Sequence, residues 1–438
     1  MAYQDCPDEY SPDACQRLAQ AVPADARDVL DIACGEGRLG EALKRLSPQR
    51  RVTGIDKNRE FAGLAAVRLD QVLMIDIEQD SLPFDAGRFD CIVAGDVFAR
   101  YADPLDILAR LRPTMRPGGH LIASLPNPQH WARIDALLRG EASPVSAAAY
   151  GVADGIRCFL DAGYLPRIVD RRFAPAPDGW LAAMRPAATR LGINPTTFAV
   201  RTQTWQYFID ARPIGNLPAA TDERPVTVGA CVNDSFILRE NLLASLCLKS
   251  GGHETLTAEG AASAAEGFNA IVAQAKHELV VLAHQDVYLP AWWIGRLWQQ
   301  YDEACRASGG KVGVMGVYGV LGTPHGILHC GCVCDRDHLL DEAPPLPACI
   351  ESLDELVLIV PKNTPLRFDP ALGFHLYGTD ICLVAESLGL QSMAIDAPCH
   401  HNSRLGDTLP AAFEQSKAIL RGKWSARLPI ATPCAIVA

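Results

Sequence analysis

Residues 281–290, VLAHQDVYLP, bring two potentially reactive side chains to the end of an apolar run. His284 and Asp286 follow VLA, and a second apolar segment leads on to Pro290. An apolar run of this length predicts a buried strand, and in open α/β sheets functional groups gather at the carboxyl ends of strands. We therefore expect Asp286 to stand at such an end, with a cap at the strand exit as the plain structural alternative.

A glycine-rich turn forms the second chemical motif. DVLDIACGEGRLG at 28–40 predicts a strand, a turn and the start of a helix, in which Gly35 and Gly37 let the backbone approach a ligand closely. Asp56 ends the next apolar run, 21 residues after Gly35 (56 − 35 = 21), a spacing that suits a carboxylate binding a ribose diol. With Gly40, the glycines also spell Gly-x-Gly-x-x-Gly, so a nicotinamide-binding domain is an open alternative.

Composition limits the classes of protein to consider. The 438 residues suggest two domains, and a formal net charge of −11 disfavours nucleic acid as a partner. No apolar stretch has the roughly 20 residues that span a bilayer, and the acidic start is unlike a secretory signal. We expect a cytoplasmic protein whose 15 cysteines stay reduced. The period-two spacing of Cys330, Cys332 and Cys334 predicts a strand rather than a zinc knuckle.

The region after the glycine-rich turn extends the first motif. Residues 72–131 read VLMIDIEQDSLPFDAGRFDCIVAGDVFARYADPLDILARLRPTMRPGGHLIASLPNPQHW. With the turn, they resemble the class I S-adenosylmethionine-dependent methyltransferases, a likeness that covers residues 10–213. The resemblance implies a Rossmann-like fold that binds S-adenosyl-L-methionine. It assigns the cofactor to six positions, namely Asp31 near the methionine part, Asp56 at the ribose, Asp76 near the adenine, and Gly35, Gly37 and Asp96.

Two departures from that family's pattern concern turnover. Ala99 and Arg100 stand where many members of the family have Glu and His, and the segment after Trp131 lacks a His-containing element of close relatives. His130, just beyond a strand end, is the remaining candidate for a catalytic base, with a structurally neutral loop histidine as the alternative. Methyl transfer depends mainly on alignment, so a missing base does not exclude it.

A Pro/Ala/charged connector at 214–224 divides the chain into domains 1–213 and 225–438. Strand and helix patterns alternate in the second half, which predicts an α/β fold with parallel strands. The tryptophan-rich helix that contains Trp292, Trp293 and Trp298 is expected to pack into the core, with an acceptor groove as the alternative.

Three blocks of the second half carry a second resemblance. GFNAIVAQAKHELVVLAHQDVYLP, LDELVLIVPKNTPLRFDPALGFHLYGTDICLVAESLGL and HHNS look like the family 2-like GT-A glycosyltransferases, in particular the streptomycin-biosynthesis-type branch. The resemblance implies a nucleotide-sugar-binding fold with a divalent cation, Mn²⁺ or Mg²⁺, that offsets charge on the leaving diphosphate.

That resemblance also assigns roles to single residues. Asp286 and His401 are the expected metal ligands, with His400 as second choice for the latter and a loop role as its alternative. His284 and Asn233 are expected at the nucleotide-sugar donor. Asp380 is expected to be the catalytic base, with a helix N-cap as its alternative, and Asp354 and Glu355 could shape the acceptor pocket.

Together these motifs predict a two-domain α/β enzyme that methylates and glycosylates a glycan, glycolipid or glycoprotein acceptor. The alternative is a glycosyltransferase whose N-terminal domain binds S-adenosyl-L-methionine without turnover, as a regulatory or scaffolding module.

Overall fold

The structure is a computed structural model that describes residues 12–141, 151–218, 224–323, 326–342, 344–404 and 409–438. The chain forms two compact units, an N-terminal unit (Met1–Asn216) and a C-terminal unit (Leu217–Ala438). The division falls within the segment predicted to be a connector. Among the described residues, no helix combines the length and the apolar character that crossing a bilayer requires.

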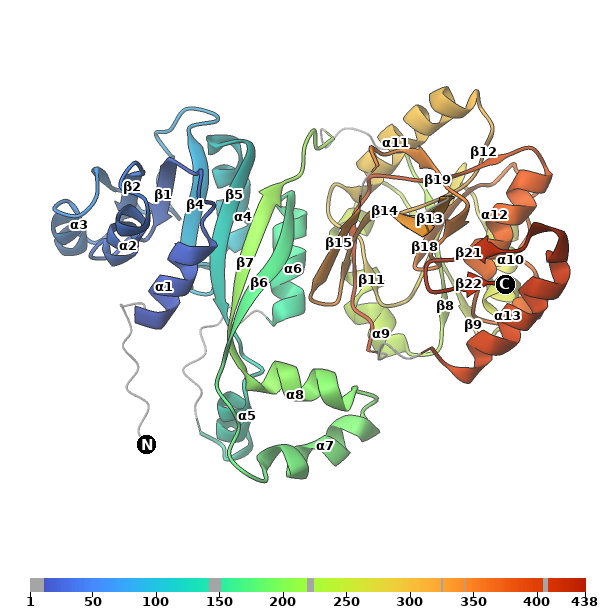
Figure 1. Ribbon diagram of the computed structural model, residues 1–438, viewed down its shortest axis with the longest axis horizontal. Coiled ribbons are helices and arrows are strands. Elements are labelled where there is room, and N and C mark those ends of the chain that lie inside the picture. Colours follow the sequence, from blue (N-terminus) through green and yellow to red (C-terminus); the bar gives the residue numbers. More distant parts are fainter. Residues whose placement is uncertain (1–11, 142–150, 219–223, 324–325, 343, 405–408) are drawn as a thin grey trace. The chain divides into compact units, whose positions relative to one another are not determined.

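The N-terminal unit is built on a seven-stranded sheet in the order β3-β2-β1-β4-β5-β7-β6 (Figure 1). Strands β1 to β5 run parallel, and β7 is inserted antiparallel between β5 and β6. This strand order confirms the Rossmann-like fold predicted for the first half. The strands are β1 (Asp28–Ile32), β2 (Arg51–Asp56), β3 (Gln71–Met74), β4 (Phe89–Gly95), β5 (Met115–Pro126), β6 (Tyr164–Phe173) and β7 (Thr204–Pro213).

Helices cover both faces of this sheet because its central strands are apolar on both sides. In β1, Val29 packs into one core cluster with α1 and α2, whereas Leu30 and Ile32 pack into the other with α4 and α6. Burial on both faces is typical of strands in a parallel sheet. The helices are α1 (Pro12–Ala21), α2 (Arg38–Leu46), α3 (Arg59–Ala65), α4 (Pro104–Leu111) and α6 (Val152–Asp161).

Three further helices lie beyond the ends of the strands rather than on a face of the sheet (Figure 1). They are α5 (Trp131–Leu138), which follows β5, and α7 (Trp180–Arg190) and α8 (Pro195–Gln203), which connect β6 to β7. We call these three helices the arm. Trp131 contacts Trp180, with ring centroids 6.4 Å apart, and Trp180 stacks on Phe198. The arm thus holds together through its own aromatic side chains.

The C-terminal unit contains a second seven-stranded sheet, in the order β16-β19-β12-β18-β10-β8-β9. Its strands are β8 (Thr227–Val232), β9 (Glu254–Glu259), β10 (Leu279–Ala283), β12 (Val312–Gly316), β16 (Ala348–Cys349), β18 (Val357–Pro361) and β19 (Gln391–Ala394). The helices of this unit are α9 (Ser235–Glu240), α10 (Ala264–Gln274), α11 (Trp293–Ser308), α12 (Tyr377–Ser387) and α13 (Ala411–Lys423). Two capping hydrogen bonds start α10, since the N-cap Ser263 accepts from the Glu266 amide and the Glu266 carboxylate accepts from the Ala262 amide.

The prediction of parallel strands in the second half does not hold for β18 or for the edge strand β16, which is antiparallel to β19. Strands β8, β9 and β10 are parallel, but β18 lies antiparallel between β10 and β12. The reason is that β18 is reached from other strands rather than through a crossover helix, and only a parallel neighbour requires such a crossover.

A smaller sheet in the order β11-β20-β14-β13-β17, with β15 paired to β14, supplies that connection. Its strands are β11 (Val287–Tyr288), β13 (Tyr318–Thr323), β14 (Gly326–Asp335), β15 (His338–Glu342), β17 (Ser352–Leu353) and β20 (Cys399–His401). Strands β21 (Ile430–Ala431) and β22 (Ile436–Val437) form a separate two-stranded sheet. Cys330, Cys332 and Cys334 are buried in β14, which confirms the strand prediction. Trp293 and Trp298 of α11 are buried in the core, which confirms theirs.

Candidate functional site

The N-terminal unit has a cavity of about 330 Å³ at the carboxyl ends of β1 to β4. This is the edge at which ligands bind in open parallel sheets. The loops after these four strands and the start of α3 supply its lining, which consists of Ala33, Gly35, Ile55, Asp56, Lys57, Asn58, Phe61, Ile75, Ile77, Glu78, Arg100 and Tyr101.

Asp56 lies in the wall of this cavity and binds the backbone of two of the loops that form it. Its Oδ2 accepts a hydrogen bond from the Gly35 amide at 2.9 Å, and its Oδ1 accepts from the Asn58 amide at 2.8 Å. Gly35 has a φ of +53° and open space where a side chain would begin. A Cβ on Gly37, by contrast, would lie 3.1 Å from the Ala65 Cα. Gly35 therefore leaves room for a ligand, whereas Gly37 lets α2 and α3 pack closely.

Ala33 lines the cavity in the left-handed region, at a φ of +52°, which a side chain makes unfavourable by about 1–2 kcal/mol. We expect Ala33→Gly to stabilise the N-terminal unit by roughly 0.5–1 kcal/mol, because glycine's greater freedom in the unfolded chain offsets part of the relieved strain. Thermal denaturation checks this, with Ala42→Gly inside α2 as the control that should destabilise. A loss of stability in Ala33→Gly would contradict the strain argument.

Asp31 is placed behind the cavity lining rather than in it. The side chain is fully buried in β1, and neither carboxylate oxygen has a hydrogen-bond partner among the described residues. Burial, reinforced by the nearby charge of Asp56, raises the pKa of Asp31 to about 8. At neutral pH this side chain is therefore mostly a neutral acid.

Asp76 and Asp96 also lie outside the set of lining residues. Asp76 accepts from the Glu78 amide at 3.1 Å, and it is Glu78 that faces the cavity. Asp96 accepts from Ser124 Oγ at 2.9 Å and from Gln206 Nε2 at 2.8 Å, and burial raises its pKa. Of the six predicted cofactor residues, the structure brings Gly35 and Asp56 to the cavity wall. Glu78 and Tyr101, which line the cavity, were missed because each follows its strand by several residues.

His130 has the geometry of a structural residue. It is 1% exposed, its Nδ1 accepts from the Ala132 amide at 3.3 Å as the N-cap of α5, and its Nε2 lies 3.1 Å from the Ala174 carbonyl oxygen. Burial also lowers its pKa. With both ring nitrogens engaged, His130 has no free position for a proton from a substrate, so this geometry does not support the predicted base.

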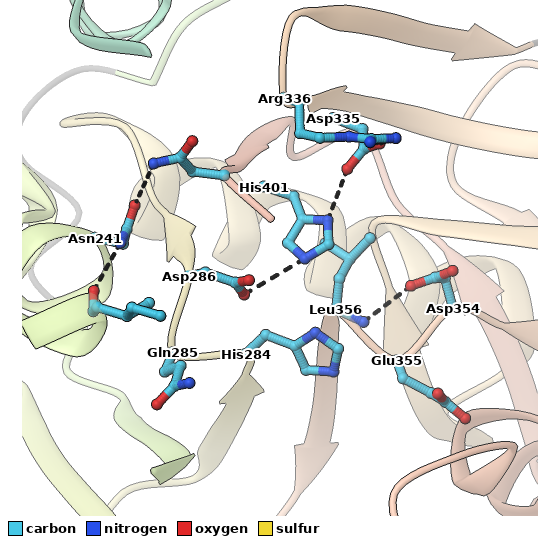
Figure 2. Close-up of polar contacts among 12 residues, drawn as sticks. Asn241, His284, Gln285, Asp286, Asp335, Arg336, Asp354, Glu355, Leu356 and His401 are labelled. Atoms are coloured by element: carbon cyan, nitrogen blue, oxygen red, sulfur yellow. Dashed lines mark hydrogen bonds and ion pairs between the residues drawn. The ribbon is translucent and has the colours of Figure 1, made fainter. Parts of the chain in front are cut away.

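In the C-terminal unit, sheet register assembles a second candidate site from distant segments (Figure 2). Strand β10 ends at Ala283, and Asp286 lies in the turn before β11 rather than at the strand end. The ladder between β11 and β20 places Val287 opposite His401, and the ladder between β14 and β20 places Asp335 opposite the same residue.

The side chains of Asp286, His401 and Asp335 form a chain of polar contacts. His401 Nε2 lies 3.4 Å from Asp286 Oδ1, and its Nδ1 lies 2.8 Å from Asp335 Oδ1. Burial alone would lower the pKa of His401, but the two carboxylates outweigh it and raise this pKa to about 10. Burial alone would raise the pKa of Asp286, but His401 outweighs it and lowers this pKa to about 2.

His284 completes the cluster. One ligand atom each of His284, Asp286 and His401 lies within 4.8 Å of the others, a spacing that could hold a metal ion. His284 Nε2 also lies 3.0 Å from the Tyr377 hydroxyl, and its ring centroid lies 5.8 Å from that of His401.

Asn233 is connected to this cluster by hydrogen bonds to Gln285, the residue between His284 and Asp286. The backbone amides of Asn233 and Asp234 both donate to Gln285 Oε1 at 3.1 Å. The Gln285 side chain therefore links the end of β8 to the end of β10. Sequence reasoning missed both Gln285 and Asp335. Asp335 ends the cysteine-rich strand, and that position was the available signal.

Asp380 is enclosed by the C-terminal segment. It is 1% exposed, its Oδ1 accepts from Trp424 Nε1 at 2.7 Å, and its Oδ2 accepts from Lys423 Nζ at 2.9 Å. Helix α12 begins at Tyr377, so Asp380 is not its N-cap either. In this geometry Asp380 binds α13 and presents no oxygen to a substrate, which does not support the predicted base.

Two other acids, Asp354 and Glu355, are drawn beside the histidine cluster in Figure 2. Glu355 accepts from the Gly378 amide at 3.3 Å, and burial, with the charge of Asp354, raises its pKa to about 8. Asp354 Oδ1 accepts from the Leu356 amide at 3.0 Å. Asp354 and Glu355 therefore add two carboxyl groups to the surroundings of this cluster.

Comparison with known proteins bears on the first of the two sites. Residues 30–121 match the family model described as a methyltransferase domain. Over 114 residues the chain is 33% identical to a ubiquinone biosynthesis O-methyltransferase of Xanthomonas axonopodis, covering 25% of this chain and 46% of that protein. Over 195 residues it is 28% identical to a trans-aconitate 2-methyltransferase of Rhodopseudomonas palustris, covering 44% and 69%.

Other matches are more limited. An uncharacterized 37.1 kDa protein from a Streptomyces fradiae transposon is 33% identical over 130 residues, 27% of this chain and 38% of that one. The chain spans about half or less of the length of the first curated relatives it matches. A solved S-adenosylmethionine-dependent methyltransferase of Thermotoga maritima is 18% identical with a TM-score of 0.33, over 45% of this chain and 86% of that one. The region that matches the methyltransferase-domain model, residues 30–121, lies in the N-terminal unit.

Proposed function

We propose that this chain is a bifunctional glycan-modifying enzyme. The N-terminal unit transfers a methyl group from S-adenosyl-L-methionine, and the C-terminal unit transfers a sugar from a nucleotide-sugar donor to a glycan, glycolipid or glycoprotein with the help of a divalent cation. The observation that carries the proposal is the presence, in one chain, of the cavity at Asp56 and of the His284–Asp286–His401 cluster.

The cavity of the N-terminal unit suits S-adenosyl-L-methionine. Its volume of about 330 Å³ is that of a small-molecule site. The carboxylates of Asp56 and Glu78 can accept from ribose hydroxyls, and Phe61, Ile75 and Ile77 offer an apolar wall to a base. The cofactor supplies the electrophilic methyl group, and the residues of this unit align the acceptor with it. Similarity to proteins named as methyltransferases supports the same assignment.

We expect Asp56→Ala to weaken the binding of S-adenosylhomocysteine by roughly tenfold or more, because the variant loses the acceptor of ribose hydrogen bonds. Isothermal titration calorimetry measures this, with the exposed Asp85→Ala as control. NAD, titrated in parallel, should not bind. Tight binding of NAD, or unchanged affinity in Asp56→Ala, would contradict the cofactor assignment.

The cluster of the C-terminal unit suits a divalent transition metal. Two imidazoles and one carboxylate form its donor set, whereas Mg²⁺ prefers oxygen ligands, so Mn²⁺ is the better fit. When bound, such an ion stabilises the charge that develops on a leaving diphosphate. Asp335 orients His401 from the opposite ring nitrogen, as carboxylates behind metal-binding histidines commonly do.

We expect Asp286→Ala to weaken Mn²⁺ binding by roughly a hundredfold and to remove Mn²⁺-dependent hydrolysis of nucleotide sugars. Calorimetry with manganese chloride and a hydrolysis screen over a panel of nucleotide sugars measure the two effects. Glu351→Ala, an exposed acid of the same unit, is the control. Unchanged hydrolysis in Asp286→Ala would overturn the metal site.

The engaged ring of His130 favours a second candidate function for the N-terminal unit. If no base or acceptor site operates there, the unit binds S-adenosyl-L-methionine without consuming it and serves as a sensor or scaffold. Turnover assays that follow S-adenosylhomocysteine release, run with and without glycan acceptors, separate the two functions.

A further inference from the structure

Few side chains of the arm are buried. Helix α5 has no buried residue, α7 buries only Ala188, and α8 buries only Thr202. Large apolar side chains on and beside these helices are exposed, namely Leu137 (62%), Leu138 (67%), Phe173 (58%), Leu191 (69%) and Val200 (38%). Exposed apolar side chains on several neighbouring helices are typical of a surface that binds a partner or a membrane.

The charge of the arm is opposite to that of the chain. Helices α7 and α8 contain Arg185, Arg190 and Arg201 and no acidic residue, and α5 contains one charge of each sign, Arg133 and Asp135. The arm is therefore positive, whereas the whole protein has a formal net charge of −11. Arg185 and Arg190 are exposed. Arginine beside exposed aliphatic and aromatic side chains is the composition of segments that lie in the interface of an anionic membrane.

The arm lies at the edge of the sheet where the carboxyl ends of β1 to β4 form the cavity. Helix α5 begins five residues after the end of β5 (131 − 126 = 5), and β7, which follows α8, carries the Gln206 that contacts Asp96 at the end of β4. The arm therefore lies at the same edge of the sheet as the cavity. A molecule held on the arm would therefore lie at the edge of the sheet that carries the cavity.

We propose that the arm docks on a membrane surface rich in anionic phospholipid, with its apolar side chains among the acyl chains and its arginines at the phosphates. The second part of the inference, which rests on the proposed methyl transfer, is that the acceptor is an amphiphile presented by that surface. An acidic protein as the partner would instead leave vesicles unbound.

Co-sedimentation of the full chain with vesicles tests the docking. Vesicles of phosphatidylcholine alone are compared with vesicles of equal parts phosphatidylcholine and phosphatidylglycerol. We expect binding only to the mixed vesicles, weakened by salt, and roughly tenfold weaker binding for Arg185→Gln/Arg190→Gln and for Leu137→Ser/Leu138→Ser. The matched controls Arg306→Gln and Leu46→Ser/Val67→Ser, at exposed positions outside the arm, should bind like the wild type.

Equal binding to both vesicles, no binding, or an equal loss in the controls would overturn the docking proposal. Circular dichroism establishes that each variant is folded, and Leu137→Ser alone replaces the double variant if the latter unfolds. Calorimetry with S-adenosylhomocysteine separates the two proposals. Vesicle binding without cofactor binding would support the docking surface and refute methyl transfer. Cofactor binding without vesicle binding would refute the docking surface and leave the proposed methyl transfer standing.

Discussion

Replacement of Asp380 by alanine is expected to destabilise the C-terminal unit by about 3 kcal/mol. The variant loses hydrogen bonds from Trp424 Nε1 and Lys423 Nζ and leaves the Trp424 donor without its buried acceptor, whereas Lys423 keeps its ion pair with Asp369 at 2.7 Å. The same contacts hold α13 against α12, where Leu376, Leu383 and Leu420 share an apolar cluster. Hydrogen exchange measured on peptides from 411–423 should show roughly a hundredfold loss of protection, because the unit opens more often.

The control for this experiment lies on the same helix. Glu386 pairs with Arg427, but both side chains are more than half exposed, so Glu386→Ala should change stability by less than about 1 kcal/mol. A catalytic carboxylate in open contact with solvent would behave differently, since its removal would leave protection unchanged. That outcome would contradict the structural role and restore Asp380 as a candidate base.

Replacement of Asp31 by asparagine is expected to remove a pH dependence from the N-terminal unit. The pKa of Asp31 is about 8 in the folded unit, because burial and the charge of Asp56 disfavour ionisation, whereas an unfolded aspartate ionises near pH 4. The folded state therefore binds the extra proton in this window, and stability falls as the pH rises from about 4 to about 8. The linked loss is on the order of 5 kcal/mol across the window.

Thermal unfolding at about pH 5 and about pH 8 measures this effect, with limited proteolysis to assign the transition to the N-terminal unit. The wild type should lose stability between the two values, and Asp31→Asn should lose much less because its amide does not titrate. Asp25→Asn, at an exposed position three residues before β1, is the control and should retain the wild-type slope. Parallel slopes in the wild type and Asp31→Asn would contradict the buried neutral acid.

The parts of the fold that could be predicted from sequence are those encoded by local patterns. The strand, glycine turn and Asp56 spacing predicted the cavity edge of the N-terminal unit, because consecutive parallel strands place their carboxyl ends together. The apolar run before His284 predicted β10, because a short continuous apolar run is typical of a buried strand. His401 was placed with Asp286 only through resemblance, and the structure brings the two together across 115 residues (401 − 286 = 115).

The remainder depends on contacts that no local pattern encodes. The enclosure of Asp380 requires α13, and nothing near Asp380 in sequence indicates that Lys423 and Trp424 reach it. Strand β11 has two residues, too few for any periodicity to show, yet it sets the position of Asp286. His130 is an N-cap because helix α5 begins directly after it. A single histidine in the sequence does not indicate that a helix begins there.

The three-residue strand β20 makes the histidine cluster sensitive to chain length. It pairs with β11 on one side and β14 on the other, and both ladders set the position of His401. Because neighbouring residues of a strand face opposite ways, a shift of one residue would bring His400 or Asn402 to the place of His401. Loop grafting or circular permutation of this protein should therefore keep the number of residues between β19 and β20 unchanged, even where the loop's own sequence is free to vary.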